Sequence, residues 1–167
     1  MDTVVSNRLP VTWYSAASSG EPLLQVPITD KAGGTAYQFA RGALRLGLQP
    51  TIVGCIGEDA AAELIIDELT SAGIAHRLQR SASAPTARSL VVFDAHGVRF
   101  MFTSSVNAND ELSAEFVRCV GPQRWDLVWL SGLCLRSRAA PRFLAVAGAV
   151  AHARKHGALV LLDVVPH

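Results

Sequence analysis

The sequence predicts an α/β fold with a mostly parallel sheet and a smaller second sheet, and one pattern in the sequence indicates each. Short apolar runs of strand length alternate with segments whose apolar residues recur at helical spacing. Such alternation is typical of parallel strands joined by crossover helices, with helices on both faces of the sheet. A stretch with a period of two in the middle of the chain breaks the alternation, and it predicts a second, smaller sheet that projects from the first.

The first predicted helix follows the glycine pair Gly33-Gly34. Its apolar residues recur at helical spacing, and they are Ala36, Phe39, Ala40, Ala43 and Leu44. Gly47 is expected to end this helix, because glycine readily takes the left-handed conformation found just past a helix. A buried strand is expected next, at 51–56, with Cys55 as a core residue.

The turn Gly57-Glu58-Asp59 predicts the start of a second helix. Asp59 suits the N-cap position, and the acidic pair suits the positive end of the helix dipole. We expect this helix to stop near Gly73. The remaining elements predicted for the layered part are a strand at 127–130, a helix from Pro141 to about His156 and a strand at 158–163.

The middle of the chain predicts a hairpin around Ala95-His96-Gly97. Ser89–Asp94 and Val98–Thr103 flank this turn and have the composition of strands. Two further short strands are expected at Val11–Tyr14 and Leu23–Ile28. The expected organisation is one α/β domain over 1–167, with the strands of the smaller sheet at about 11–28 and 86–103.

Composition excludes several classes of function. Half of the residues are hydrophobic and 17% are charged, which excludes a disordered chain. The formal net charge is +1 and the basic residues are scattered, so we expect no nucleic-acid partner. No apolar run approaches the roughly 18 residues of a membrane span, and the first ten residues do not have the pattern of a signal peptide.

Cysteine and histidine spacing gives no support for a metal centre. The three cysteines form no CxxC pair, which is typical of reduced thiols, and we expect a cytoplasmic protein. His152 and His156 have the i, i+4 spacing of a metal pair. They lie beside Lys155 at a predicted helix end, where cationic side chains are favoured, and we expect no metal ligands.

Three turns are candidates for ligand binding, because ligands of open α/β sheets bind beyond the carboxyl ends of the strands. They are Gly33-Gly34, Gly57-Glu58-Asp59 and the segment at Asp163. A glycine pair before a helix either forms only a tight loop or lets a ligand approach the free N–H groups of the helix. The spacing by itself leaves both interpretations open.

Five small residues at fixed spacing resemble the first signature of ribokinase-like (PfkB-type) sugar and nucleoside kinases. The matching residues are Gly33, Gly34, Ala40, Gly47 and Gly57. Gln38 stands where this signature has an asparagine that hydrogen-bonds substrate hydroxyls. Glutamine keeps the amide group but moves it by about 1.5 Å, the length of one carbon–carbon bond.

Other segments are similar to the same family in order and spacing, over about residues 30 to 167. They are Val53–Asp59, Leu69–Ile74, Pro85-Thr86 with the hairpin through Gly97, Asn107–Asn109, Asp126–Gly132 and Leu161–Asp163. The resemblance implies a ribokinase-like three-layer α/β/α fold, with a mostly parallel sheet and a small projecting β lid over the sugar. It also implies that the C-terminal half of the family fold is missing from this sequence.

The resemblance implies a carbohydrate kinase that uses ATP and Mg to phosphorylate a hydroxymethyl group of a sugar or nucleoside. The expected substrate-binding residues are Gly33, Gly34, Gln38, Asn109 and a lid residue, Phe102 or Ser89. Phe102 and Asn109 also have a plain structural interpretation, as lid packing and as a turn residue. Asp2 and Asp30 are poor matches to the aspartate with which the family grips the sugar.

The second family signature, which supplies the anion hole and the aspartate base, does not occur in the sequence. Without these groups phosphoryl transfer loses its main sources of catalysis, so we expect no catalytic residue in this chain. Two functions stay open: the substrate-binding half of a kinase, inactive by itself, or a non-catalytic protein that binds a small molecule or oligomerises. We expect a homo-oligomer or a partner that supplies the missing half, because a truncated sheet leaves an unpaired strand edge.

Overall fold

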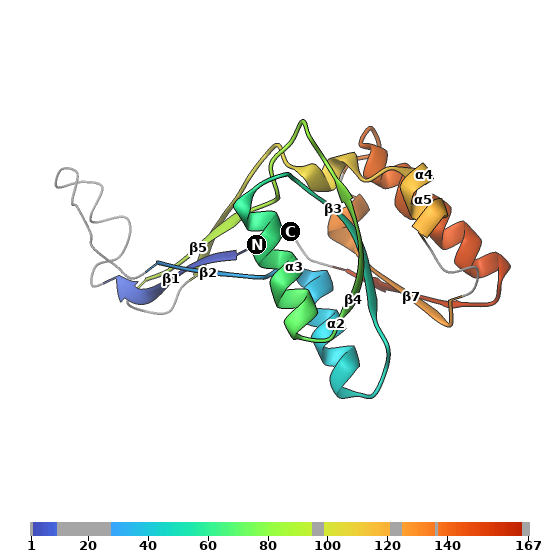
Figure 1. The fold of residues 1–167 in the computed structure, drawn as a ribbon, viewed down its shortest axis with the longest axis horizontal. Helices are drawn as coiled ribbons and strands as arrows, with labels where there is room; N and C mark the ends of the chain where they lie inside the picture. The colour runs from blue at the N-terminus through green and yellow to red at the C-terminus, as the bar shows by residue number, and fades with distance from the viewer. Residues whose placement is uncertain (1, 10–27, 95–98, 121–124, 136, 165–167) are drawn as a thin grey trace.

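The computed structural model describes residues 2–9, 28–94, 99–120, 125–135 and 137–164 (Figure 1). The strands are β1 (Asp2–Leu9), β2 (Ile28–Lys31), β3 (Thr51–Ile56), β4 (Ala75–Arg80), β5 (Ser89–Asp94), β6 (Arg99–Thr103), β7 (Leu127–Ser131) and β8 (Leu159–Asp163). The α-helices are α2 (Thr35–Arg45), α3 (Ala60–Ser71), α4 (Ala114–Val120) and α5 (Pro141–Lys155). Two short 3₁₀ helices are η1 (Ala108–Glu111) and η2 (Gly132–Leu135).

Two pairs of parallel strands form the layered part of the molecule. β3 pairs with β4 and β7 pairs with β8, and each pair is parallel, which confirms the predicted α/β class. Helix α2 contacts both β3 and β7, and the Phe39 ring stacks on the Trp129 ring with centroids 4.5 Å apart. No hydrogen-bonded pairing joins β3 to β7 among the described strands.

A separate four-stranded sheet, which we call the lid sheet, projects to one side of the layered part (Figure 1). Its strand order is β2-β1-β5-β6, with β5 and β6 antiparallel as predicted for a hairpin. The other two strands differ from the prediction. They lie at 2–9 and 28–31, whereas the strand expected at 11–14 and most of that at 23–28 fall outside the described residues. The polar run Ser6-Asn7-Arg8 is not typical of a strand, and the pairing of β1 with β5 is irregular between Val5 and Leu9.

Three helix ends lie at the residues that the sequence predicted. Gly47 has a φ of +80° just past α2, and the N–H of Leu48 donates to the carbonyl of Ala43 at 3.1 Å. This is the geometry of a glycine-terminated helix. Asp59 caps α3, with Oδ1 accepting from the Ala62 N–H at 2.9 Å, and Pro141 opens α5. The sequence did not predict α4, η1 or η2, which are all short.

Two apolar clusters occupy the two faces of β3. Ile52 packs against a cluster from α2, α3 and neighbouring strands, whose buried members are Ala32, Tyr37, Ala40, Leu69 and Ile74. Val53 and Cys55 belong to the other cluster, whose remaining buried members are Ala84, Ala108, Leu112, Val117 and Ala145. Successive residues of a strand point to opposite faces, so β3 separates the two clusters. Cys55 is 2% exposed, as predicted for a core residue.

Candidate functional site

The glycine pair forms the loop that leads from β2 into α2. Gly34 has a φ of +93° and a ψ of 154°, a backbone region that is essentially restricted to glycine. Its carbonyl accepts from the N–H of Gln38 at 3.1 Å. No side chain caps the start of α2, so its first N–H groups are left for another acceptor.

Gln38 lies in the first turn of α2 and is exposed. The neighbouring Tyr37 is buried, and its hydroxyl donates to Glu68 Oε2 at 3.2 Å. Burial, with the nearby Glu68 carboxylate, raises the pKa of the Tyr37 hydroxyl. The Tyr37 anchor therefore fixes the rotation of α2 and leaves the Gln38 amide on the outer side of the helix.

Strand register places the two candidate lid residues on opposite faces of the lid sheet. Ser89 is opposite Thr103, and Leu90 is opposite Phe102. Side chains alternate along a strand, so Ser89 and Phe102 belong to different cross-strand rows, although both border one hollow at this end of the sheet. Phe102 is 52% exposed and lines a hollow of about 540 Å³ together with Asp30, Arg88, Ser89, Leu90, Thr103 and Ser104.

Asp2, which the sequence left as a poor match, begins β1 beside the glycine loop. It is opposite Lys31 on β2 and opposite Ser89 on β5. Lys31 is only two residues before Gly33, so the first residue of β1 lies next to the loop that leads into α2. The strand register reveals this position, because the strands expected from the sequence in this part of the chain did not include β1.

Asn109 and Asn107 have different surroundings. Asn107 caps η1, with Oδ1 accepting from the Asn109 N–H at 3.1 Å and Nδ2 donating to the Ser104 carbonyl at 3.0 Å. The Asn109 side chain is exposed. Between them, the N–H of Ala108 donates to the Pro85 carbonyl at 2.8 Å, which ties this turn to the loop before the lid hairpin.

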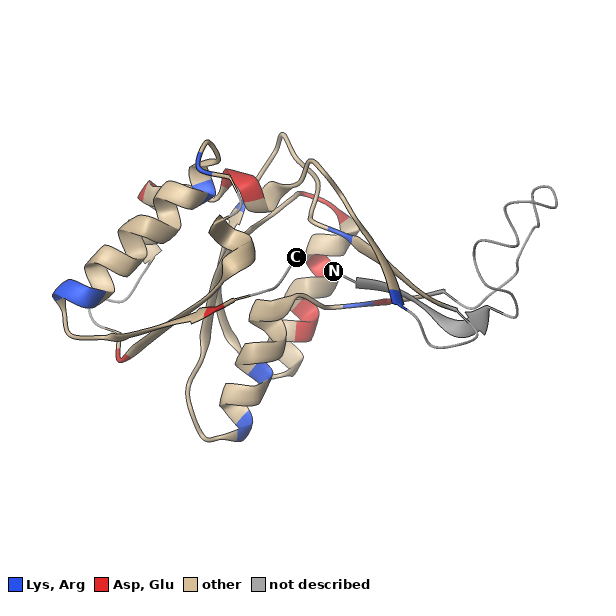
Figure 2. Ribbon diagram, turned by 180° about the vertical axis from the view of Figure 1, so that it is seen from behind, with Lys and Arg blue, Asp and Glu red and all other residues tan. Residues whose placement is uncertain are grey.

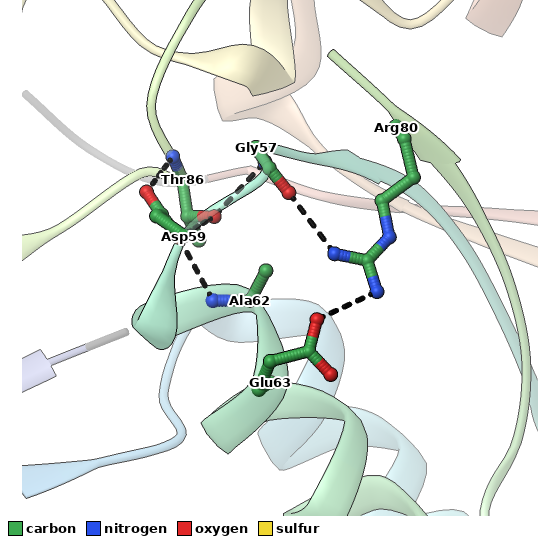
Figure 3. A network of polar contacts seen from close by, with 6 residues as sticks. All are labelled: Gly57, Asp59, Ala62, Glu63, Arg80 and Thr86. Carbon is green, nitrogen blue, oxygen red and sulfur yellow. Dashed lines mark hydrogen bonds and ion pairs between the residues drawn. The ribbon is translucent and has the colours of Figure 1, made fainter. Parts of the chain in front are cut away.

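A network around Asp59, which we call the Asp59 network, joins the start of α3 to the loop before β5 (Figure 3). Thr86 donates twice to the Asp59 carboxylate, from Oγ1 to Oδ1 at 2.7 Å and from its N–H to Oδ2 at 2.9 Å. Thr86 Oγ1 in turn accepts from the Gly57 N–H at 2.9 Å. Burial by itself raises the pKa of Asp59, but the hydrogen bonds from Thr86 and Ala62 outweigh it and the net pKa is lowered.

Arg80 lies on the other side of the Gly57 turn. Its guanidinium donates to the Gly57 carbonyl at 3.3 Å and pairs with Glu63 Oε1 at 2.8 Å (Figure 3). A shallow hollow of about 410 Å³ lies here, lined by Glu58, Asp59, Ala60, Glu63 and Arg80. Three carboxylates against one guanidinium do not favour an anionic ligand, so these contacts act as structural support for the turn.

The segment at Asp163 ends β8, and its register partner Ser131 ends the adjacent strand β7. Ser131 is 3% exposed, and its Oγ accepts from the Leu133 N–H at 3.3 Å. Arg142, from the start of α5, donates to the Leu133 carbonyl at 3.2 Å and pairs with Asp110 at 2.9 Å. These contacts fix the loop after β7 at the carboxyl end of the strand pair.

Charged residues of both signs are interspersed over the described part of the chain, without a region of one sign (Figure 2). The described residues contain no group of three or more His, Cys, Asp or Glu that could hold a metal ion. The rings of His152 and His156 have centroids 4.4 Å apart and are tilted by 41°, and the Trp125 ring meets His152 edge-on. No described helix is long and apolar enough to cross a membrane.

Comparison with models of protein families shows the family to which this chain belongs. The model of the pfkB family carbohydrate kinases matches residues 9–166. The chain belongs to the pfkB family of carbohydrate kinases. This confirms the resemblance seen in the sequence, and the paired parallel strands with their lid sheet have the ribokinase-like fold of that family.

This pfkB-family chain is similar in sequence to proteins that are named as bifunctional. "Bifunctional protein HldE" from Pseudomonas savastanoi pv. phaseolicola is 34% identical over 112 residues, which cover 62% of this chain and 23% of that protein. The protein of the same name from Pseudomonas aeruginosa (strain LESB58) is 36% identical over 90 residues, which cover 50% of this chain and 19% of that protein. The chain therefore matches about a fifth to a quarter of the length of these relatives.

Solved kinases share the fold of this pfkB-family chain at low sequence identity. A fructokinase from Xylella fastidiosa superposes with a TM-score of 0.79 and 21% identity over 99% of this chain and 48% of its own. The same fructokinase has also been solved with bound ATP. A putative ribokinase II from E. coli gives a TM-score of 0.76 and 20% identity over 97% and 49% of the two chains. The chain thus spans about half the length of the solved kinases it matches.

Proposed function

We propose that this chain forms the substrate-binding portion of an ATP-dependent sugar or nucleoside kinase. In the complete kinase the γ-phosphate of ATP would be transferred to a hydroxymethyl group. Gly33, Gly34 and Gln38 form the floor of the proposed substrate site, with Asn109 and the lid residues Ser89 or Phe102 at its edge. Membership of the pfkB family and the sugar kinases among the structural neighbours support the proposal.

The observation that best supports this proposal is that the lid sheet lies beside the glycine loop. The register joins Asp2 to Lys31 and to Ser89, directly beside the loop at Gly33-Gly34. We therefore add Asp2 to the proposed site, in the role of the family's sugar-gripping aspartate. An aspartate at the head of β1, the Gln38 amide and the N–H groups at the start of α2 would together supply donors and acceptors to one ligand. Such groups are suited to the hydroxyls of a sugar.

The same register ranks the two lid candidates. Ser89 shares a cross-strand row with Asp2, whereas Phe102 belongs to the row of Leu90 and therefore to the opposite face. If Asp2 holds the sugar, Ser89 is the lid candidate in the same row, and Phe102 borders the same hollow from the neighbouring row. Ser89→Trp should then weaken binding of sugar more than Phe102→Trp does.

Binding of sugars to the chain tests the proposal directly. Calorimetry with a panel of hexoses, pentoses and nucleosides should find at least one ligand whose affinity falls tenfold or more in Asp2→Asn and in Gln38→Ala. Arg45→Ala at the far end of α2 is the matched control and should bind like the wild type. Equal affinities in Asp2→Asn, Gln38→Ala and the wild type would refute the assigned site.

We further propose that the isolated chain does not turn over ATP. ATP and Mg are expected to act in the complete kinase, and the sequence contains no second glycine-rich signature with an aspartate base. An assay of sugar-dependent ADP release should stay at background for this chain. Release well above background would show that the chain carries its own catalytic groups.

A second candidate function is a non-catalytic protein that binds a small molecule or oligomerises. The observation that favours it is the apolar exposure of β8 and its end, where Leu159, Leu161, Leu162 and Val164 are 46–76% exposed. Large exposed apolar patches often mark interaction sites. A homo-oligomer, or a partner that covers β8, would appear in sedimentation as a mass above 17.8 kDa.

We place the protein in the cytoplasm, and the free thiols of Cys55, Cys119 and Cys134 support that proposal.

A further inference from the structure

Helix α5 ends with two histidines whose rings lie close together. His152 and His156 are one helical turn apart, and the N–H of His156 donates to the carbonyl of His152 at 3.2 Å. Their ring centroids are 4.4 Å apart, and both residues are exposed. The Trp125 ring lies beside the pair, with its centroid 6.0 Å from that of His152. The sequence predicted no metal ligands here, but it could not predict how close the two rings are.

The separation of the rings fits two ligands of one metal ion. A metal–nitrogen bond of about 2.0 Å places the centroid of an imidazole about 3.2 Å from the metal. Two such rings have centroids about 4.5 Å apart when their bonds meet at about 90°, and about 5.2 Å apart at the tetrahedral angle. The observed 4.4 Å therefore corresponds to adjacent corners of a square or an octahedron. Nickel(II) and copper(II) favour such geometries and bind imidazole well.

We propose that His152 and His156 chelate one divalent metal ion of the nickel or copper class. Each imidazole would bind through one ring nitrogen, while its other nitrogen keeps a hydrogen bond that orients the ring. The described residues contain no group of three or more His, Cys, Asp or Glu that could hold a metal ion, so water would complete the coordination. Arg154 and Lys155 are exposed neighbours, and solvent ions screen the repulsion between their charges and the metal.

The proposed metal site lies away from the carboxyl ends of β7 and β8. Helix α5 connects these two parallel strands, so it runs back from their carboxyl ends to their amino ends. It has 15 residues and spans about 22 Å. Just after the helix, the N–H of Leu159 donates to the carbonyl of Asp126 at 2.9 Å, where both strands begin. Metal binding at this end goes beyond the proposed kinase role and does not depend on it.

Calorimetric titration of the whole chain with nickel chloride tests the proposal. Nickel is the probe because copper(II) also oxidises thiols, and Cys119 is exposed. His152→Ala and His156→Ala should each weaken nickel binding at least tenfold, because a chelate becomes a single ligand. His76→Gln, which removes an imidazole from β4, is the matched control and should bind like the wild type. No nickel binding by the wild type, or unchanged affinity in either variant of the pair, would overturn the proposal.

A rearranged variant separates chelation from histidine content. His156→Ala combined with Arg154→His keeps two histidines at the end of α5, but they point about 200° apart around the helix. This double variant should bind nickel no better than His156→Ala alone. Recovery of the wild-type affinity would show that nickel binds single histidines, and it would contradict chelation. The substituted positions are exposed, so all variants should keep the urea midpoint of the wild type.

The fluorescence of Trp125 reports where the ion binds. Nickel(II) quenches a nearby indole, and the Trp125 ring meets His152 edge-on. Saturating nickel should therefore lower the fluorescence of the wild type. Trp125→Phe should lose this decrease while keeping its nickel affinity within twofold. A decrease of the same size in Trp125→Phe would place the ion elsewhere and refute the site. Because none of these experiments measures sugar binding, their failure would leave the proposed kinase role untouched.

Discussion

The Asp59 carboxylate receives two hydrogen bonds from Thr86, a residue 27 positions later in the chain. The same Oδ1 atom also accepts from the Ala62 N–H and so caps helix α3. One carboxylate therefore holds the start of a helix and the loop that leads into the lid hairpin.

Asp59→Ala should destabilise the fold by about 2–4 kcal/mol, because an N-cap is lost together with two hydrogen bonds to a charged acceptor. Urea denaturation measures the change in the free energy of unfolding. Glu58→Ala is the matched control, since Glu58 is exposed and precedes the cap, and it should cost less than about 0.5 kcal/mol. Equal losses in the two variants would contradict a structural role of the network.

The stability should also depend on pH through Asp59. Its pKa is lower in the folded chain than in the unfolded chain, where an aspartate titrates near pH 4. The stabilisation is therefore present above about pH 4 and is lost as the pH falls through the folded pKa. The difference in free energy of unfolding between the wild type and Asp59→Asn should shrink from pH 6 to pH 3. A constant difference would show that the Asp59 charge contributes nothing.

Gly57 has no room for a side chain. A Cβ at this position would lie 2.7 Å from the Thr86 nitrogen and 2.9 Å from the Ala84 carbonyl oxygen, both of which are backbone atoms. Gly57→Ala should therefore cost about 1–3 kcal/mol, as expected for overpacking. Gly42→Ala is the control, because Gly42 lies within α2 with open space around it, and it should stabilise by about 0.5–1 kcal/mol. Thermal denaturation should move the two melting temperatures in opposite directions.

The stack of Phe39 on Trp129 should couple α2 to β7 energetically. The rings are 4.5 Å apart and 10° from parallel, and aromatic pairs of this kind contribute about 0.5–1.5 kcal/mol beyond burial. A double-mutant cycle with Phe39→Leu and Trp129→Leu should yield a coupling energy in that range. The cycle of Phe39 with Val128, on the opposite face of β7, should give a coupling energy below about 0.5 kcal/mol. Coupling of equal size in both cycles would exclude a specific stack.

Local features of the fold could be predicted from the sequence, and contacts between distant segments could not. Asp59 was predicted as a helix cap because the capped N–H lies three residues away, within one turn. Its hydrogen bonds to Thr86 depend on how the loop before β5 returns to α3, which no local pattern encodes. Gly47 and Pro141 likewise mark helix ends by their own backbone preferences.

In the candidate site, too, local features could be predicted from the sequence and contacts between distant segments could not. The loop at Gly33-Gly34 and the start of α2 follow from a glycine pair before apolar residues at helical spacing, but the buried position of Tyr37 does not. The relation of Ser89 to Phe102 depends on strand register, and the position of Asp2 depends on the pairing of β1 with both β2 and β5. Register is set by which residues of distant strands meet, so the sequence alone left Asp2 unassigned.

The two apolar clusters on the faces of β3 have no buried residue in common among the described residues. Regions that are packed separately can open separately, each with its own free energy. Amides of α4 and α5 should therefore exchange as one block and those of α2 and α3 as another, with β3 as the slowest segment because it belongs to both. Natural variation that loosens one block would then leave the architecture of the other intact.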